Sequence, residues 1–497
     1  MGQHRQLIGL FGVLVAAIAV GFNDQVIAAM LQDLLGAKGV GHDAGTWIKS
    51  LCLSAEVVGM AVSPWLLVTF NLRRFAVFAT ALNVVTTVAI PFATSAHTID
   101  ALRVAEGLAG GFTIPLLMTT ALRVTAPEIR LYDLAVYALI ATFTPGLGPA
   151  LAALWTDVIG RRFIFLQAIP LGALAPVLEW YGLPQDRPDY RRFARFDCRG
   201  MLLLTIGFGS LTTLLQQGDR LDCFASPTIV LLGLASVIAV PLLLVNEWFH
   251  ELPLLMLQMF GRRHFLYGTI ALFTAMLIGL WASKLPLTFL VELHGYQPLQ
   301  AFGVIIPITL AQFVMLPLLA TVLDNPRIDA RLISFLGLAC ILLACVGCAG
   351  ITPAWNREQF YVWQLLQAVG QPMVVIPSLM IATNSVVPQE GPYVSAMVNT
   401  PRVLAEATGI WLLGLLGRWW GGLHRVRLAD TLGQNWFVPQ MSDGQRTAFA
   451  HDIAVQAKVL TFADGFRIMA ALTVALMVLL VLLPERMSPP RLHLASA

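Results

Sequence analysis

The chain has 497 residues, of which 57% are hydrophobic and 12% are charged, and its mean hydropathy is +0.75. Soluble domains carry about 25% charged residues, so the composition excludes a water-soluble globular protein and indicates an integral membrane protein. The 31 basic and 28 acidic side chains leave a net charge of +3, which is too small to indicate nucleic acid as a partner.

Apolar segments of spanning length recur along the whole sequence. A spanning helix needs about 20 mostly apolar residues, and about fourteen segments meet this requirement. We predict these helices at roughly 7–31, 46–68, 75–93, 101–122, 132–155, 163–182, 200–216, 227–248, 265–290, 300–323, 331–351, 359–383, 393–416 and 466–483. The first segment is too long for a cleavable signal and lacks a small-residue cleavage site, so we expect it to be retained. An even number of spans places both termini on one side.

The connections between these segments differ in their basic content. One alternate set is rich in arginine: Arg73, Arg74, Arg123, Arg130, Arg187, Arg191, Arg192, Arg195, Arg199, Arg262, Arg263, Arg327, Arg331, Arg486 and Arg491. The opposite set is poorer in basic residues, and Arg161 and Arg162 form its only doublet before its long last loop. The positive-inside rule therefore predicts that both termini are cytoplasmic, in a cell (inner) membrane, and long outer loops do not overturn this assignment.

The polar centre of the sequence divides it into two parts. We predict an all-α integral membrane fold with two six-helix halves and two linking transmembrane helices. The predicted parts are an N-terminal half (1–182), a cytoplasmic loop (183–199), the linking helices (200–264), a C-terminal half (265–483) with an outer loop (418–465), and a cytoplasmic tail (484–497). The outer loop is of mixed polarity and is expected to contain some helix.

The fourth apolar segment carries the most informative polar residues. Arg103 and Glu106 are three positions apart and so share one helix face. An arginine at membrane depth costs about 2.5 to 3.5 kcal/mol on insertion scales, so such residues face other protein or a water-filled cavity. Gly107 and Gly111 have the small-xxx-small spacing that lets a second helix approach closely. The segment therefore predicts a transport pathway.

Asp24 lies within the first segment and is the leading candidate for a proton-binding site. A carboxylate held away from water beside a cation can bind a proton near neutral pH, although a solvated position at a helix end is the alternative. Glu106 is a second candidate for proton coupling, with Arg103 as its charge partner. If Arg103 and Glu106 form a static ion pair, Glu106 stays ionised and carries no proton.

Four further ionisable residues are candidates for the substrate cavity. Glu56 in the second segment is expected to line it. Lys284, two residues before Pro286, is expected to bind an anion or a carboxylate, with snorkelling to an interface as the alternative. Arg402 and Glu406 are four positions apart, and a self-neutralised structural pair is the leading interpretation of these two residues.

No catalytic, cofactor or metal-binding motif is found. The sequence contains no HExxH motif, no phosphate-binding Gly-Lys-Ser/Thr loop and no nucleophile elbow. Cys345 and Cys348 are spaced like half of a zinc site, but no second ligand pair accompanies them, so we expect buried cysteines that behave as small hydrophobic residues. No cofactor is expected, and the energy for transport is expected to come from an ion gradient.

Two stretches resemble motifs of the drug:proton antiporters of the major facilitator superfamily. In LRVAEGLAGGFTIPL, Arg103 and Gly107 match the fourth-helix motif, while Glu106 replaces the usual Gln. TPGLGPALAALW is similar to the antiporter motif of the fifth helix, in which Gly148 and Pro149 match and two alanines stand where the family usually has two glycines.

Further stretches are similar to the fourteen-helix branch of this superfamily, typified by EmrB and QacA. FNDQVIAAML resembles its first-helix motif, with Asp24 at the acidic position, and the similarity extends over nearly the whole chain. The loop VTFNLRRF departs from the family pattern, because it keeps Arg73 and Arg74 but has Thr69 in place of an acid and Leu72 in place of a glycine. Gating is therefore expected to differ.

The resemblance implies proton-driven export of hydrophobic, often cationic, compounds by alternating access, with Asp24 and Arg103 as coupling residues. It also implies that a periplasmic adaptor and an outer-membrane channel are candidate partners, besides the lipid bilayer and a small-molecule substrate. An alternative function is export of a specific metabolite, siderophore or organic anion, with Lys284 and Arg402 as the binding charges. A membrane enzyme or sensor is disfavoured, because the sequence has no catalytic constellation.

Overall fold

The computed structural model describes residues 2–37, 42–93, 95–125, 129–155, 167–384, 386, 390–435 and 442–483. The helices are α1 (Gly2–Ala37), α2 (His42–Phe70), α3 (Leu72–Ala89), α4 (Ala96–Val124), α5 (Arg130–Leu154), α7 (Ala168–Gly182), α8 (Cys198–Gln217), α9 (Pro227–Phe249), α10 (Arg263–His294), α11 (Pro298–Phe302), α12 (Ile306–Leu323), α13 (Ala330–Cys348), α14 (Arg357–Asn384), α15 (Gly391–Leu415), α16 (Gly421–Asn435) and α17 (Asp443–Val481). Short turns are η1 (Ile90–Phe92), η3 (Tyr190–Arg195), η4 (Cys223–Ala225), η5 (Leu257–Gly261) and the π-helical η7 (Leu416–Trp420). These residues include no strand.

The all-α membrane fold predicted from the sequence is confirmed. Twelve helices in the described part of the chain are long and apolar enough to cross a membrane. The two other predicted segments are also helical, since α7 and α15 cover them. The predicted start of the sixth segment, at 163, falls outside the described residues. Polar caps define several starts, as where Ser95 accepts a hydrogen bond of 3.2 Å from the Thr98 amide at the start of α4.

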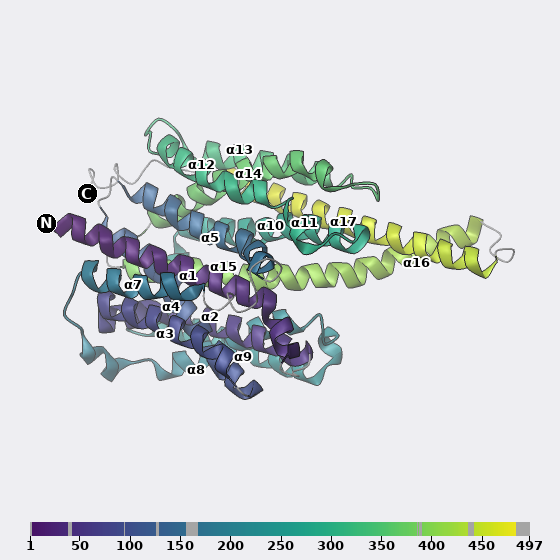
Figure 1. The fold of residues 1–497 in the computed structure, drawn as a ribbon. Helices are drawn as coiled ribbons and strands as arrows, with labels where there is room; N and C mark the ends of the chain where they lie inside the picture. Colours follow the sequence, from purple (N-terminus) through teal and green to yellow (C-terminus); the bar gives the residue numbers. More distant parts are fainter. Residues whose placement is uncertain are drawn as a thin grey trace.

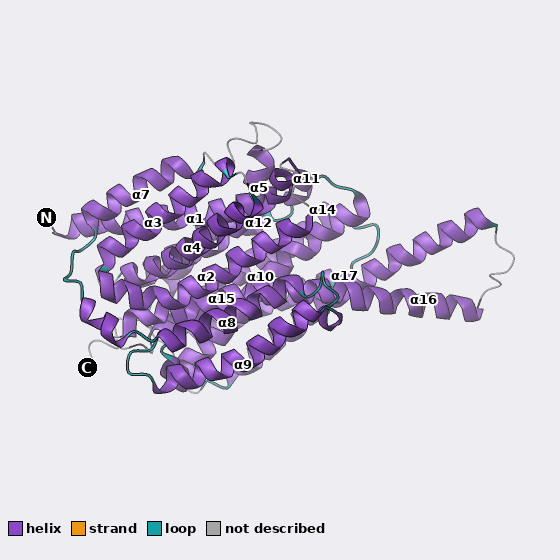
Figure 2. Cartoon of the chain, turned by 90° about the horizontal axis from the view of Figure 1, so that it is seen from below, coloured by secondary structure: helices purple, strands orange, loops and turns teal. Residues whose placement is uncertain are grey.

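The spanning helices pack side by side in one bundle, and a helical hairpin projects from it (Figures 1 and 2). The hairpin consists of α16 and the first part of α17, so much of the segment predicted as an outer loop is helical. α17 begins at Asp443, although the sequence predicted a start at 466. The polar first part of α17 is helical because it packs on α16. We call this end of the bundle the hairpin end, and the opposite end, where α1 begins, the terminal end.

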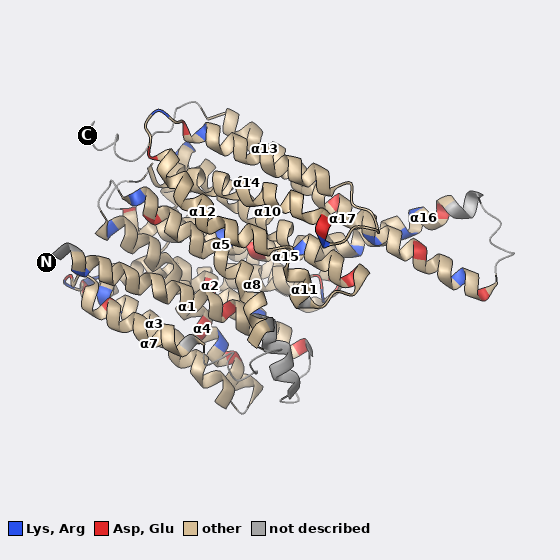
Figure 3. Cartoon of the chain, turned by 45° about the horizontal axis from the view of Figure 1, so that its top comes forward, with Lys and Arg blue, Asp and Glu red and all other residues tan. Residues whose placement is uncertain are grey.

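The arginine-rich connections gather at the terminal end. Nε of Arg73 donates a hydrogen bond of 2.7 Å to the carbonyl of Leu183, and Arg123 forms an ion pair of 2.7 Å with Asp186. Nε of Arg5, near the start of α1, donates to the carbonyl of Tyr181 at 2.6 Å. Figure 3 shows charged residues at both ends of the bundle and along the hairpin, while most of the length of the bundle helices is uncharged.

The loop that departs from the family pattern is held by contacts of its own. Asn71 has a left-handed backbone (φ 83°), and its side chain caps α3 by accepting a hydrogen bond of 2.9 Å from the Arg74 amide. Nδ2 of Asn71 also donates to the carbonyl of Asp186 at 3.1 Å. Thr69, in place of an acid, bonds only within its helix through its hydroxyl, to the carbonyl of Trp65 at 2.7 Å. The long polar loop therefore docks on this turn.

Candidate functional site

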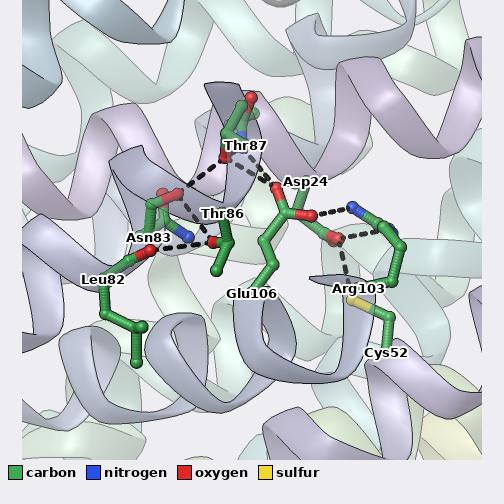
Figure 4. A network of polar contacts seen from close by, with 9 residues as sticks. Asp24, Cys52, Leu82, Asn83, Thr86, Thr87, Arg103 and Glu106 are labelled. Carbon is green, nitrogen blue, oxygen red and sulfur yellow. Dashed lines mark hydrogen bonds and ion pairs between the residues drawn. The ribbon is translucent and has the colours of Figure 1, made fainter. Parts of the chain in front are cut away.

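An arginine and two carboxylates from α1 and α4 meet inside the bundle (Figure 4). NH1 of Arg103 lies 2.6 Å from Oε2 of Glu106, and NH2 lies 3.5 Å from Oδ1 of Asp24. The side chains of Arg103 and Glu106 are 1% and 3% exposed, whereas that of Asp24 is 36% exposed. Glu106 is thus nearly fully buried, and Asp24 is partly exposed.

Glu106 is held by three side chains at once. Its Oε1 accepts hydrogen bonds from Nδ2 of Asn23 at 2.6 Å and from Oγ1 of Thr87 at 2.9 Å, while its Oε2 accepts from Arg103. All three neighbours act as hydrogen-bond donors to this carboxylate. Asp24 has fewer partners, since its Oδ1 has only the longer contact with Arg103 and lies 4.0 Å from Sγ of Cys52. The arrangement holds Glu106 by three donors and leaves Asp24 with fewer partners.

Glycines allow the helices that carry these charges to pack closely. A Cβ atom on Gly107 would lie 2.2 Å from the carbonyl oxygen of Cys52, and one on Gly111 would lie 2.2 Å from that of Glu56. The close helix approach predicted from the small-xxx-small spacing is therefore confirmed, with α2 as the partner of α4. The close approach of the two helices brings α2 beside the charge cluster.

A glycine has the same role on α5. A Cβ atom on Gly148 would lie 2.3 Å from Cβ of Gln25, so this glycine packs α5 against α1 next to Asp24. Pro149 follows in α5, and its side chain falls outside the described residues. The sequence therefore places a small residue where the fifth helix passes the candidate proton site.

Two adjoining cavities lie between the halves of the bundle. The deeper one has a volume of about 60 Å³, and its charged lining consists of Asp24, Glu56, Glu106, Arg402 and Glu406. The broader one has a volume of about 180 Å³. Its charged lining consists of Lys49, Lys284, Arg402 and Glu406. Because Arg402 and Glu406 line both, the two cavities are adjacent, and we call them together the central site.

The expected ion pair between Arg402 and Glu406 is not formed. Both residues are in the described part of the chain, and no ion pair within 4 Å joins them; Nε of Arg402 is buried without a hydrogen-bond partner. The side chains follow one face of α15 as their spacing predicts, but that face lines the cavity. Lys284 also lines the broad cavity with an exposed side chain.

The central site is closed toward the terminal end. The hydroxyl of Tyr137 on α5 donates to Oδ1 of Asn399 on α15, and Oγ of Ser395 donates to the carbonyl of Pro115 on α4 at 2.8 Å. NH2 of Arg192 in η3 donates to the hydroxyl of Tyr393 at 3.2 Å. These contacts join α5, α4 and η3 to α15 on the side toward the terminal end, whereas the cavity linings occupy the middle and the hairpin-side parts of the helices.

Three site residues were not identified from the sequence. Lys49 precedes Glu56 by seven positions, a spacing that places both on one helix face and that could have signalled it. Thr87 and Tyr137 look like ordinary polar residues of apolar helices, and only the packing of separate helices gives them partners. Among the described residues, no group of three or more His, Cys, Asp or Glu side chains is arranged to hold a metal ion.

Comparisons with known proteins agree with this architecture. Residues 13–410 match the Major Facilitator Superfamily. The probable multidrug resistance protein EmrY of Escherichia coli is 27% identical over 412 residues, 81% of this chain and 78% of that protein. The multidrug export protein EmrB of Escherichia coli is 23% identical over 432 residues, 86% of this chain and 84% of that protein.

A solved structure shares the fold. The human organic anion transporter MFSD10 superimposes with a TM-score of 0.59 at 14% identity, covering 94% of this chain and 99% of that one. The TM-score supports a common fold, and at 14% identity the match says nothing about the substrate.

Proposed function

The chain belongs to the Major Facilitator Superfamily, and we propose that it exports hydrophobic or cationic drugs, or other toxic compounds, in exchange for protons by alternating access. Its family and relatives are transporters rather than enzymes, and the relatives EmrY and EmrB carry multidrug resistance and export in their names. The observation that carries the proposal is the position of Asp24, whose carboxylate touches the buried Arg103 and also lines the central cavity.

In this proposal Asp24 takes up and releases the transported proton. Sequence alone left open whether Glu106 carries a proton or stays ionised in an ion pair. The hydrogen bonds from Asn23, Thr87 and Arg103 favour the second role, in which Glu106 keeps Arg103 in place. When Asp24 gains or loses its proton, its attraction to Arg103 changes, and Glu106 takes up no second proton that would compete.

The acidic side chains of the deeper cavity give the transporter its attraction for cations. Glu56 and Glu406 line it together with Asp24. A cationic substrate bound near these carboxylates disfavours proton binding to Asp24, and a bound proton disfavours the substrate, because like charges repel at short range. Such mutual exclusion is what exchange transport requires. Arg402 and Lys284 complete the charged lining.

The contacts at the terminal end act as a gate that is closed in this conformation. Opening it requires breaking the bonds that Tyr137 and Ser395 make between the halves. We propose the two-half division, with α8 and α9 as linking helices, as the basis of this movement. The membrane proposed is the inner membrane, with the terminal end cytoplasmic because its connections are rich in arginine. A periplasmic adaptor and an outer-membrane channel remain proposed partners, which would meet the hairpin end.

Reconstituted transport tests the function directly. Proteoliposomes with an imposed pH gradient are loaded with the fluorescent cation ethidium, and its movement is followed with and without the gradient. The proposal predicts concentrative ethidium movement that requires the gradient and stops when a protonophore collapses it. Movement at the same rate without a gradient would rule out proton coupling.

A further inference from the structure

The central site is divided by charge. Among its described lining residues, the deeper cavity has four carboxylates, Asp24, Glu56, Glu106 and Glu406, and one cation, Arg402. The broad cavity has the opposite balance, with Lys49, Lys284 and Arg402 against Glu406 alone. Two regions of opposite sign thus adjoin within one site.

The cations of the broad cavity have no strong partners in the described structure. Lys49 and Lys284, on α2 and α10, line the same cavity with exposed side chains and form no ion pair within 4 Å with any described residue. Elsewhere the chain pairs such groups, as Lys458 is paired with Glu292 at 2.9 Å. Exposed lysines without an ion-pair partner can form charge-assisted hydrogen bonds with an anionic group of a bound compound.

A buried amide points to the same conclusion. Gln312 on α12 lines the broad cavity and is 1% exposed, yet neither its Nε2 nor its Oε1 has a hydrogen-bond partner in the described structure. Buried amides are almost always hydrogen-bonded. A cavity that holds an unsatisfied amide donor as well as two lysines offers hydrogen-bond donors to a polar, anionic group.

We propose that the central site binds zwitterionic amphipathic compounds, with an ammonium group in the deeper cavity and a carboxylate held by Lys49 and Lys284 in the broad one. The inference rests on the proposed function and names its substrate class. Apolar residues of the broad cavity, among them Met276, Leu280 and Phe302, contact the body between the two charges. The ammonium group competes with proton binding at Asp24, so the compound is still exchanged for a proton. The carboxylate fixes the orientation of the compound.

A pair of probes that differ by one charge tests this assignment. Aminomethyl-biphenyl carboxylic acid has both charges at opposite ends of a rigid apolar body, and its methyl ester keeps only the ammonium. Binding of each to the purified full-length protein is measured by calorimetry for the wild type and for Lys49→Gln/Lys284→Gln. Lys458→Gln is the matched control, because it removes a lysine that lies outside the cavity.

The acid is expected to bind the wild type at least about tenfold more tightly than the ester, since a charge-assisted hydrogen bond contributes about 1.5 to 3 kcal/mol. The double variant is expected to lose this preference while it binds the ester as before, and Lys458→Gln is expected to keep it. Equal affinity of acid and ester in the wild type, or an equal loss of both in the double variant, would overturn the inference.

The outcome is separable from that of the proposed function. Proton release on binding of the ester reports exchange with a cation and does not involve the lysines. If the ester releases protons but the acid has no preference, the inference fails and the proposed function stands. If neither compound releases protons, proton-coupled exchange itself is contradicted.

Discussion

Nδ2 of Asn23 donates a hydrogen bond of 2.6 Å to Oε1 of Glu106, joining α1 to α4 beside the charge cluster. The same amide nitrogen lies 2.6 Å from Oγ1 of Thr87 on α3, so three helices meet at one carboxylate. Hydrogen bonds to charged groups contribute about 1.5 to 3 kcal/mol each. This network makes Glu106 a fixed counter-charge for Arg103 and distinguishes it from Asp24, one residue along from Asn23.

Replacing Glu106 by Gln is therefore expected to retain substrate-dependent proton release. The neutral amide leaves Arg103 with Asp24 as its anionic partner, so the residue that is proposed to carry the proton stays in place. The measurement is the number of protons released per substrate bound, which is expected to equal that of the wild type. A variant that binds substrate but releases no proton would show that Glu106 itself carries the proton.

The packing of α4 on α2 gives a matched pair of substitutions. Gly107→Ala places a Cβ 2.2 Å from the backbone carbonyl oxygen of Cys52, whereas Gly110→Ala, in the same helix, meets only Cγ1 of Val20 at 3.4 Å. Overpacking against rigid backbone costs about 1 to 3 kcal/mol. Gly107→Ala is therefore expected to lower the thermal midpoint of the purified protein in detergent, and Gly110→Ala to leave it close to that of the wild type. Equal midpoints for both variants would contradict the close contact.

Removing a single hydroxyl group is expected to weaken the gate at the terminal end. Tyr137→Phe removes the hydrogen bond to Asn399 between the two halves and leaves the ring in place. A buried hydrogen bond contributes about 0.5 to 1.5 kcal/mol, so the population open at this end is expected to rise between roughly twofold and tenfold. The readout is the rate at which a hydrophilic maleimide labels Val398→Cys, a buried position in α15, after the six native cysteines have been replaced.

Ser63→Ala is the control for this experiment. It removes a hydrogen bond of 3.2 Å from Ser63 to the carbonyl of Phe112, which joins two helices of the same half. Labelling is expected to remain at the wild-type rate in this variant. Faster labelling to the same degree in both variants would indicate general loosening of the bundle rather than opening of a gate.

The fold was largely predictable because membrane helices are specified locally. Each spanning segment is a long apolar run that the chain reveals without knowledge of its neighbours. The pairing of Arg103 with Glu106 follows from a spacing of three residues on one helix, so it too could be read from the sequence. The same spacing rule failed for Arg402 and Glu406, because proximity along a helix does not decide whether two side chains turn to each other or to a cavity.

Contacts between distant helices were not predictable from one sequence. Thr87 and Glu106 meet only because α3 packs beside α4, and Tyr137 and Asn399 are separated by 262 positions in the chain. Some helix was expected in the segment of α16 and early α17, but their pairing as a hairpin was not predicted. Amphipathic helices that pair with each other outside the bundle lack the continuous apolar pattern of a span. Periodicity identifies the helices, and tertiary packing selects the partners.

The central claim is that Asp24 exchanges the proton that drives transport, and proton release on substrate binding tests it most directly. Wild type, Asp24→Asn and the control Glu251→Gln, an exposed carboxylate outside the bundle interior, are each titrated with a substrate in weakly buffered detergent solution while the pH is recorded. The account predicts release from the wild type and from Glu251→Gln, and binding without release in Asp24→Asn. Release of as many protons from Asp24→Asn as from the wild type would contradict it.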